Sequence, residues 1–123
     1  MQVLLSVKPE FADKIFDGRK KYEYRRVIFK NKDVKKVVVY VSSPISKVIG
    51  EFDIGEIMFD DLNDLWNKTK NYAGVSKEYF FDYFANKNNG YAIKIKNYSR
   101  YESPRRLQSK YGVLPPQSFL YLT

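Results

Sequence analysis

The sequence predicts a mainly β protein of the α+β class, a small β-barrel with one helix after the first strand and two helices between the fourth and fifth strands. Short runs with β-branched residues or period-two alternation recur along the chain, helical spacing is confined to three segments, and glycines interrupt one strand. A chain of 123 residues with 44% apolar residues has the size of one domain with one core. We therefore expect residues 1–123 to form a single domain.

The first two elements are predicted to be a strand and a helix. Val3 to Lys8 is short and largely apolar, and the following Pro9 cannot continue a ladder but suits the first turn of a helix. In that helix Phe11 and Ile15 are four residues apart, so they share a face. Gly18 stands where a helix commonly ends in the left-handed conformation.

Three strands are predicted to follow. From Lys21 the period changes to two, which gives the second strand one aromatic face and one charged face. The β-branched run from Lys35 to Ser43 indicates a central strand covered on both faces. Lys47 to Phe59 resumes strand character, and Gly50 and Gly55 inside it favour bulges or bends that curl a sheet into a barrel.

The second half of the chain turns helical and then extended again. Leu62 to Thr69 has apolar residues at helical spacing, and Ser76 can cap a further helix that runs to about Phe84. Tyr91 to Lys96 alternates as a strand does. We interpret residues 98–112 as a basic polar loop, and residues 115–122 as a rigid turn followed by the last strand.

The composition excludes several kinds of chemistry. The chain has no cysteine and no histidine, which removes disulfides, zinc fingers, cysteine nucleophiles and histidine general bases. It also has no P-loop, no dinucleotide glycine fingerprint and no metal-ligand cluster. We therefore expect no cofactor and no metal, and any chemistry must use lysine, carboxylate, tyrosine, serine or threonine side chains.

The charge balance points to a polyanionic partner. The formal net charge is +8, and a positive field of this size concentrates nucleic acid near the protein. A surface charge that serves solubility alone is the alternative. The longest apolar run, Val37 to Val41, is far shorter than a membrane span, and the N-terminus lacks the order of a signal peptide. We expect a cytoplasmic protein, a monomer, with no membrane partner.

One short stretch concentrates the polar chemistry. In GRKKYEYRR, residues 18–26, Glu23 is the single carboxylate among five cations. Glu23 and Arg25 share a strand face, and Lys20 lies at the turn before the strand, so the three can converge. Such a carboxylate can accept hydrogen bonds from the exocyclic amine of cytosine, adenine or guanine while the cations hold phosphate. The alternative is that Glu23 only neutralises Arg25 on a solvated strand face.

The spacing G-x-K-x-x-E-x-R, present as Gly18, Lys20, Glu23 and Arg25, resembles the motif of the activating signal cointegrator homology (ASCH) family. The upstream SVKPEFADKIFDG resembles the same family, and VVVYVSSP, KVIGEFDIGEI, GYAIKI and PPQSFLYL resemble a branch described as predicted transcriptional regulators. This resemblance covers nearly the whole chain. It implies a PUA-like β-barrel with a cleft, lined by the motif, for RNA or a modified nucleoside.

The resemblance implies two function classes. The first is a nucleic-acid-binding module, for RNA or else DNA, with a regulatory role in transcription or RNA metabolism. The second is a small hydrolase, because one branch of the family cleaves N4-acylated cytidine through lysine, threonine and glutamate and others are described as ribonucleases. Lys20 matches the catalytic lysine, whereas Glu23 stands at the threonine position. In that reading Glu23 activates a water and Lys20 steadies the oxyanion. An adaptor that binds protein through its basic face is a third class.

Other candidates for nucleic-acid binding lie at strand ends, in the basic loop, or on strands that the resemblance puts near the cleft. Each also has a structural interpretation, as a solvated charge, a turn former or a core aromatic residue. Tyrosines on strands can stack on bases, and basic loops can follow a phosphate backbone. These residues are Lys8, Lys21, Tyr40, Ser42, Ser43, Tyr91, Arg105, Arg106, Gln117 and Ser118.

Overall fold

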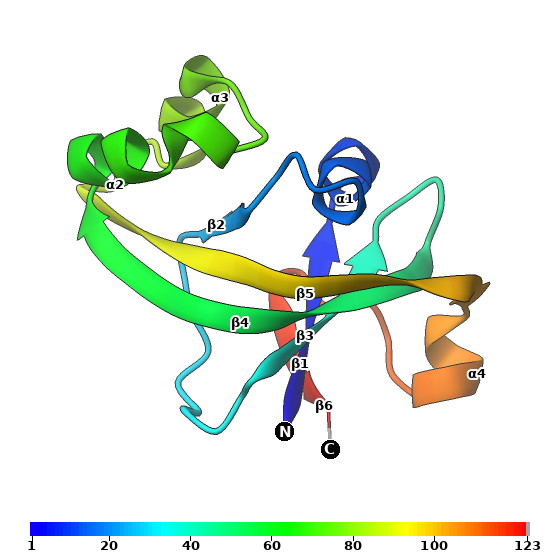
Figure 1. The fold of residues 1–123 in the computed structure, drawn as a ribbon. Helices are drawn as coiled ribbons and strands as arrows, with labels where there is room; N and C mark the ends of the chain where they lie inside the picture. Colours follow the sequence, from blue (N-terminus) through cyan, green and yellow to red (C-terminus); the bar gives the residue numbers. More distant parts are fainter. Residues whose placement is uncertain (123) are drawn as a thin grey trace.

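The computed structural model describes residues 1–122, which form a bent six-stranded sheet with helices packed against it (Figure 1). The strands are β1 (Gln2–Val7), β2 (Tyr22–Arg25), β3 (Lys36–Val41), β4 (Lys47–Asp61), β5 (Asn89–Arg105) and β6 (Phe119–Leu122). The helices are α1 (Pro9–Phe16), α2 (Leu62–Thr69), the 3-10 helix η1 (Lys70–Tyr72), α3 (Lys77–Tyr83) and α4 (Leu107–Tyr111). The predicted α+β class is confirmed, with one helix after the first strand and the predicted pair between β4 and β5.

The strand order is β2-β5-β4-β3-β1-β6. β1 and β3 pair in parallel, and the other pairs of the described sheet are antiparallel. The long strands β4 and β5 bend, so that β1, β3 and β6 cross beneath them at a steep angle (Figure 1). β2 and β6 are the two edges of the sheet, so the expected barrel is not closed. β2 has four residues and pairs with β5.

Two of the three register shifts between β4 and β5 involve the glycines that the sequence analysis singled out. The register shifts between Val48 and Gly50, between Glu51 and Asp53, and over residues 54–57, which include Gly55. At Gly50 a Cβ atom would lie 2.5 Å from Cζ of Phe16, because α1 rests on the sheet there. The predicted bulges are confirmed, and Gly50 also makes room for α1.

The sheet is buried on both faces along β3, as the sequence predicted. Val37, Val39 and Val41 belong to one core cluster, and Val38 and Tyr40 belong to another on the opposite face. A third cluster lies under α2 and α3 and contains Leu65, Phe80, Phe84, Tyr24 and Ala92. These clusters fix β2 and its neighbours from both sides, which positions the residues of the candidate site.

Local sequence signals explain the helix boundaries. Pro9 is in the first turn of α1, and Ser76 caps α3 by accepting a hydrogen bond from the backbone N–H of Tyr79 at 3.0 Å. Asp61 caps α2 in the same way, with the N–H of Asp64 as the donor at 2.9 Å. Each cap satisfies a backbone donor that would otherwise lack a partner in the first turn.

The interpretation of residues 98–112 as a basic loop is wrong. β5 continues to Arg105 because the first half of β4 pairs with it, from Val48 to Asp53. The polar residues of this part of β5 occupy a solvent-exposed sheet surface, which hides the strand in the sequence. α4 then follows, with Leu107 buried and Gly112 ending the helix at a φ of 69°.

Two negative findings concern the described residues. Within residues 1–122, no helix is long and apolar enough to cross a membrane. The same residues contain no group of three or more acidic, histidine or cysteine side chains that could hold a metal ion.

Candidate functional site

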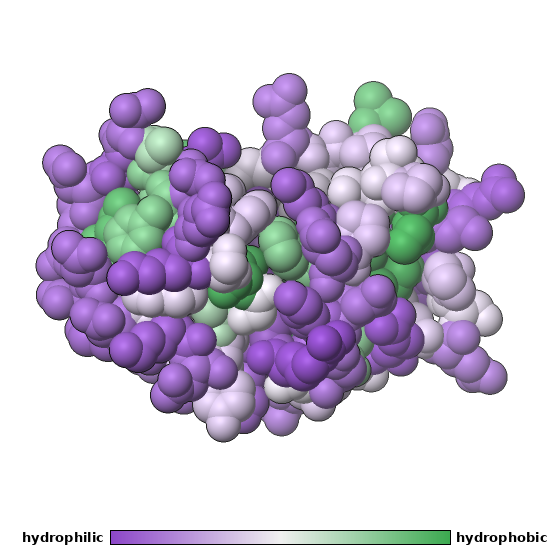
Figure 2. Space-filling model, turned by 90° about the horizontal axis from the view of Figure 1, so that it is seen from above, coloured by the Kyte–Doolittle hydropathy of each residue, from purple (hydrophilic) through white to green (hydrophobic). Residues whose placement is uncertain are grey.

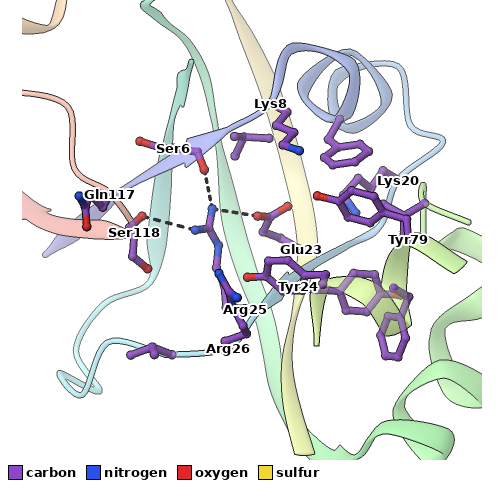
Figure 3. A pocket seen from close by; sticks show the side chains of 16 residues that line it. Ser6, Lys8, Lys20, Glu23, Tyr24, Arg25, Arg26, Tyr79, Gln117 and Ser118 are labelled. Atoms are coloured by element: carbon purple, nitrogen blue, oxygen red, sulfur yellow. Dashed lines mark hydrogen bonds and ion pairs between the residues drawn. The ribbon is translucent and has the colours of Figure 1, made fainter. Parts of the chain in front are cut away.

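A pocket of about 410 Å³ opens between α1, α3, β2 and the ends of β1 and β6 (Figure 3). Glu23 and Arg25 of β2 form part of its wall, and Lys20, from the turn before β2, joins them. Lys8 lies at the start of α1, and Gln117 and Ser118 precede β6. The volume is within the range of small-molecule sites in proteins.

Glu23 and Arg25 form a buried ion pair in this wall. One residue separates them on β2, so their side chains leave the same face. Nη2 of Arg25 lies 2.9 Å from Oε2 of Glu23, and the two side chains are 10% and 9% exposed. The alternative of a charge pair on a solvated strand face is therefore wrong, because both groups are buried beside a pocket.

Arg25 also connects the two sides of the open sheet. Its Nη2 donates a hydrogen bond to the backbone carbonyl of Ser6 at 2.7 Å, and its Nη1 donates to the carbonyl of Ser118 at 3.4 Å. Figure 3 shows the guanidinium between these carbonyls and Glu23. Its Nε is buried without a hydrogen-bond partner among residues 1–122. A side chain thus bridges the gap that backbone pairing leaves between β2 and the β1–β6 edge.

Lys20 is a buried cation at the other end of the wall. The residue is 2% exposed, and its Nζ donates a hydrogen bond to the carbonyl of Ala73 at 2.7 Å. The ammonium lies 4.9 Å from the ring centroid of Tyr24 and 5.4 Å from that of Phe11. Burial lowers the pKa of Lys20 from 10.5 to about 8, although the negative charge of Glu23 opposes this shift. Lys20 is therefore expected to lose its proton at a lower pH than an exposed lysine does.

Aromatic side chains of α3 form the wall opposite the charges. Tyr79 and Tyr83 are one helical turn apart, and their rings are nearly parallel, at an interplanar angle of 9° with centroids 6.3 Å apart. Lys8 lies over the ring of Tyr79 at 5.4 Å, and Arg26 lies over that of Tyr83 at 4.8 Å. Both tyrosine rings thus make cation–π contacts with basic side chains.

The structure brings six of the predicted site residues to this pocket: Lys8, Lys20, Glu23, Arg25, Gln117 and Ser118. Sequence analysis missed Tyr79 and Tyr83, which it placed in a helix but did not name as candidate site residues. The neighbouring Phe80 and Phe84 of the same helix are buried in the core. The missed signal is that Tyr79 and Tyr83 form a second pair four residues apart. Each tyrosine precedes a phenylalanine of the buried pair by one residue, so the tyrosines lie on a different face of the helix.

The other predicted residues lie elsewhere. Lys21 is exposed and covers the ring of Tyr72, and Tyr40 is buried in the core. Ser42 and Ser43 belong to the turn after β3, where the N–H of Ser42 donates a hydrogen bond to the carbonyl of Val7. None of these residues lines the pocket.

Tyr91, Arg105 and Arg106 also lie outside this pocket. Tyr91 packs on Phe59, with ring centroids 4.5 Å apart. Arg105 and Arg106 line a separate, shallow hollow beside α4, where Arg105 lies 3.7 Å from the ring centroid of Tyr101.

Comparisons with known proteins place the chain in a family. Residues 1–113 match the family described as "Domain of unknown function (DUF365)". The crystal structure of ASCH from Zymomonas mobilis is 28% identical in sequence, with a TM-score of 0.91, over 99% of this chain and 87% of that one. This chain belongs to the DUF365 family and is an ASCH domain. The PUA-like fold predicted for the ASCH domain is confirmed by the same likeness.

The ASCH domain is also similar to curated proteins. An "ASCH domain-containing ribonuclease" of Zymomonas mobilis is 26% identical over 126 residues, which cover 98% of this chain and 84% of that protein. ATP synthase subunit alpha of Ureaplasma parvum is 34% identical over 122 residues. The large ribosomal subunit protein uL22 of the same species is 28% identical over 123 residues. The chain spans 15% and 39% of the length of these two Ureaplasma proteins.

Proposed function

We propose that this ASCH domain binds RNA and takes one unpaired nucleobase into the pocket between α1 and α3. The observation that carries the proposal is the pocket wall, on which Lys20, Glu23 and Arg25 are all buried opposite two parallel tyrosines. Buried charges are expensive unless they have partners, and they gather at sites where a ligand supplies further partners.

The wall matches the polar edge of a base. Arg25 holds one oxygen of the Glu23 carboxylate at 2.9 Å and so fixes its orientation at the pocket. A carboxylate accepts hydrogen bonds from the exocyclic amines of cytosine, adenine and guanine, whereas uracil offers a carbonyl at the equivalent place. Lys20 can donate to a ring acceptor beside the amine. The pocket should therefore prefer amine-bearing bases to uracil.

Charge and relatives support RNA as the ligand. The chain has a formal net charge of +8, and Lys8 and Arg26 flank the tyrosines at the pocket. Figure 2, seen from the side of α1, α2 and α3, shows a largely hydrophilic surface with few apolar side chains between the polar ones. A similar protein is named a ribonuclease, and RNA is the substrate that this name implies. The regulatory role in transcription stays a prediction from the resemblance.

A hydrolase is the second candidate, because the pKa of Lys20 near 8 suits a group that exchanges protons at neutral pH. Glu23 would take a proton from water while the water oxygen attacks phosphorus or an acyl carbon, and Lys20 would stabilise the oxyanion that forms. The bond to the leaving oxygen or nitrogen would then break, and the leaving group would take the proton from Glu23. The ion pair with Arg25 favours binding over this chemistry, since it holds Glu23 as a fixed acceptor.

The test uses a matched pair of charge-neutralising variants. Glu23→Gln changes the pocket, whereas Glu51→Gln makes the same change on β4, where Glu51 pairs with Lys36. Binding of CMP, AMP, GMP, UMP and fluorescent RNA octamers is measured by calorimetry and anisotropy at 50 and 200 mM salt. The same samples are run on gels to detect cleavage.

We expect the amine-bearing nucleotides to bind more tightly than UMP. Glu23→Gln should weaken their binding by about 5- to 30-fold, because a hydrogen bond to a charged group exceeds one to a neutral group by about 1–2 kcal/mol. Glu51→Gln should bind as the wild type does. Octamer affinity should fall with salt. The proposal fails if no nucleotide or RNA binds, or if Glu23→Gln leaves all affinities unchanged. Cleavage that Glu23→Gln abolishes would favour the hydrolase.

A further inference from the structure

A row of side chains runs from the pocket across three strands. Arg25 of β2 is the register partner of Tyr91 of β5, and Tyr91 is the partner of Phe59 of β4. Directly opposed residues of antiparallel strands share a face of the sheet, about 5 Å apart at each step. This is the face opposite α2 and α3, because the neighbouring Tyr24 and Ala92 pack beneath those helices. The row therefore leaves the pocket along the sheet.

The far part of this row is apolar and exposed. Phe59 is 55% exposed, and its ring packs on Tyr91 with centroids 4.5 Å apart. Ile57, two residues before Phe59 on the same face, is 40% exposed. Val27, at the rim of the pocket, is 57% exposed. Side chains of this size seldom stand exposed together without a partner.

A second hollow, which is basic, begins at Ile57, two residues before Phe59 on β4. This hollow has a volume of about 610 Å³ and is lined by Ile57 and by Lys30, Lys32 and Lys35 of the segment that joins β2 to β3. Glu56 is the one carboxylate among its lining residues. The aromatic pair is thus next to the charged pocket through Arg25, the register partner of Tyr91, and next to a hollow with three lysines through Ile57.

We infer that Phe59 and Tyr91 form a stacking platform for the nucleotide next to the one in the pocket, with the lysine hollow holding the phosphates that follow. The inference rests on the proposed function and adds the path of the strand. Single-stranded nucleic acids bind where aromatic rings alternate with a cationic groove, because each base has a face that can stack. An apolar protein partner would not need the lysines, and a phosphate chain alone would not need the exposed rings.

The test separates the platform from the pocket by ligand length. CMP or AMP reaches the pocket alone, whereas a fluorescent RNA tetramer also reaches the platform. The variants are Phe59→Ser and Phe59→Ser/Tyr91→Ser, with Tyr98→Ser as the control, since Tyr98 is an exposed aromatic residue of the same strand as Tyr91. Phe59 is more than half exposed, so Phe59→Ser alone should keep the fold. Circular dichroism verifies this.

We expect Phe59→Ser to weaken the binding of the RNA tetramer by about 5- to 150-fold, which is the range for the loss of one base–aromatic stack. Mononucleotide affinity should be unchanged, and Tyr98→Ser should match the wild type. In Lys30→Gln/Lys32→Gln, the slope of log affinity against log salt should fall by about 0.7 for each lost phosphate contact.

Each other outcome overturns the platform. Unchanged tetramer affinity in the serine variants would do so, as would equal losses for tetramer and mononucleotide, because the effect would then act through the pocket. A wild-type dimer that Phe59→Ser converts to a monomer in sedimentation would show that the rings form a self-interface. Intact, Glu23-dependent mononucleotide binding in these cases would leave the proposed function standing, whereas its absence would defeat both.

Discussion

Replacing Arg25 by methionine should destabilise the protein strongly. The guanidinium is the partner of Glu23 at 2.9 Å and also binds the carbonyls of Ser6 and Ser118. Its loss leaves a carboxylate whose side chain is 9% exposed without its cation. Removing one member of a buried pair costs about 3–5 kcal/mol, against a total stability of about 5–15 kcal/mol for a domain.

A double-mutant cycle identifies the cause of this loss. In Glu23→Gln/Arg25→Met no charge is left alone, so the remaining cost is that of the two carbonyls that lose their donor, about 1–3 kcal/mol. The double variant should therefore be more stable than Arg25→Met. Urea denaturation followed by circular dichroism measures both, and with a slope of about 2 kcal/mol per molar urea the midpoint of Arg25→Met should fall by about 2 M.

Two results would refute this reasoning. A loss below about 1 kcal/mol for Arg25→Met would mean that water reaches the carboxylate and replaces the guanidinium. Additive losses in the cycle would mean that Glu23 and Arg25 do not interact, whatever their distance. Either result would also remove the fixed acceptor on which the proposed base recognition depends.

Three further predictions concern the surroundings of this wall. Gly74→Ala should cost more than Gly112→Ala in urea denaturation, because both have a φ of 69° but a Cβ at Gly74 would lie 2.5 Å from Cγ of Lys20, whereas nothing lies within 4 Å at Gly112; equal costs would contradict the packing. Between pH 8 and 10.5 the unfolded chain keeps a proton on Lys20 that the folded chain has lost, so the free energy of unfolding should rise with pH by up to about 3 kcal/mol. Titration of the urea midpoint should show this rise as a growing difference between the wild type and Lys20→Met, since the raised pKa of the buried Tyr24 lowers the stability of both proteins above about pH 10. Tyr24→Phe should cost about 1 kcal/mol, because the Tyr24 hydroxyl and Thr69 Oγ1 share a buried hydrogen bond of 2.6 Å; an unchanged melting curve would show that this bond contributes nothing.

The charged wall could be predicted from the sequence because it depends on local geometry. Strand alternation alone puts Glu23 and Arg25 on one face, and the turn glycine Gly18 puts Lys20 at the start of that strand. The burial of Lys20 could not be predicted, since it depends on residues distant in sequence: Ala73 accepts its hydrogen bond and Gly74 packs on its stem.

The parts that sequence analysis missed share one physical cause. Tyr79 and Tyr83 look like core residues by composition, and which of two aromatic pairs on α3 faces the core is decided by how the helix rotates onto the sheet. The second half of β5 is polar on its exposed face, so its period-two signal is weak, and its partner β4 defines it as a strand. In both cases the local structure is determined by packing against a neighbouring element and not by the sequence of the segment itself.

The stability cost of the wall gives the strongest reason to connect it with a ligand. Apolar replacements of buried ion pairs are often neutral or stabilising, so a fold gains little by keeping three buried charges side by side. If Glu23 and Arg25 serve the fold alone, Glu23→Gln/Arg25→Met should bind RNA as the wild type does once it is folded. If they serve a ligand, the folded double variant should bind more weakly than the wild type by at least the factor seen for Glu23→Gln. Anisotropy titration of the octamer with the double variant decides between these explanations. It is done without urea, at a temperature at which circular dichroism shows that the variant is folded.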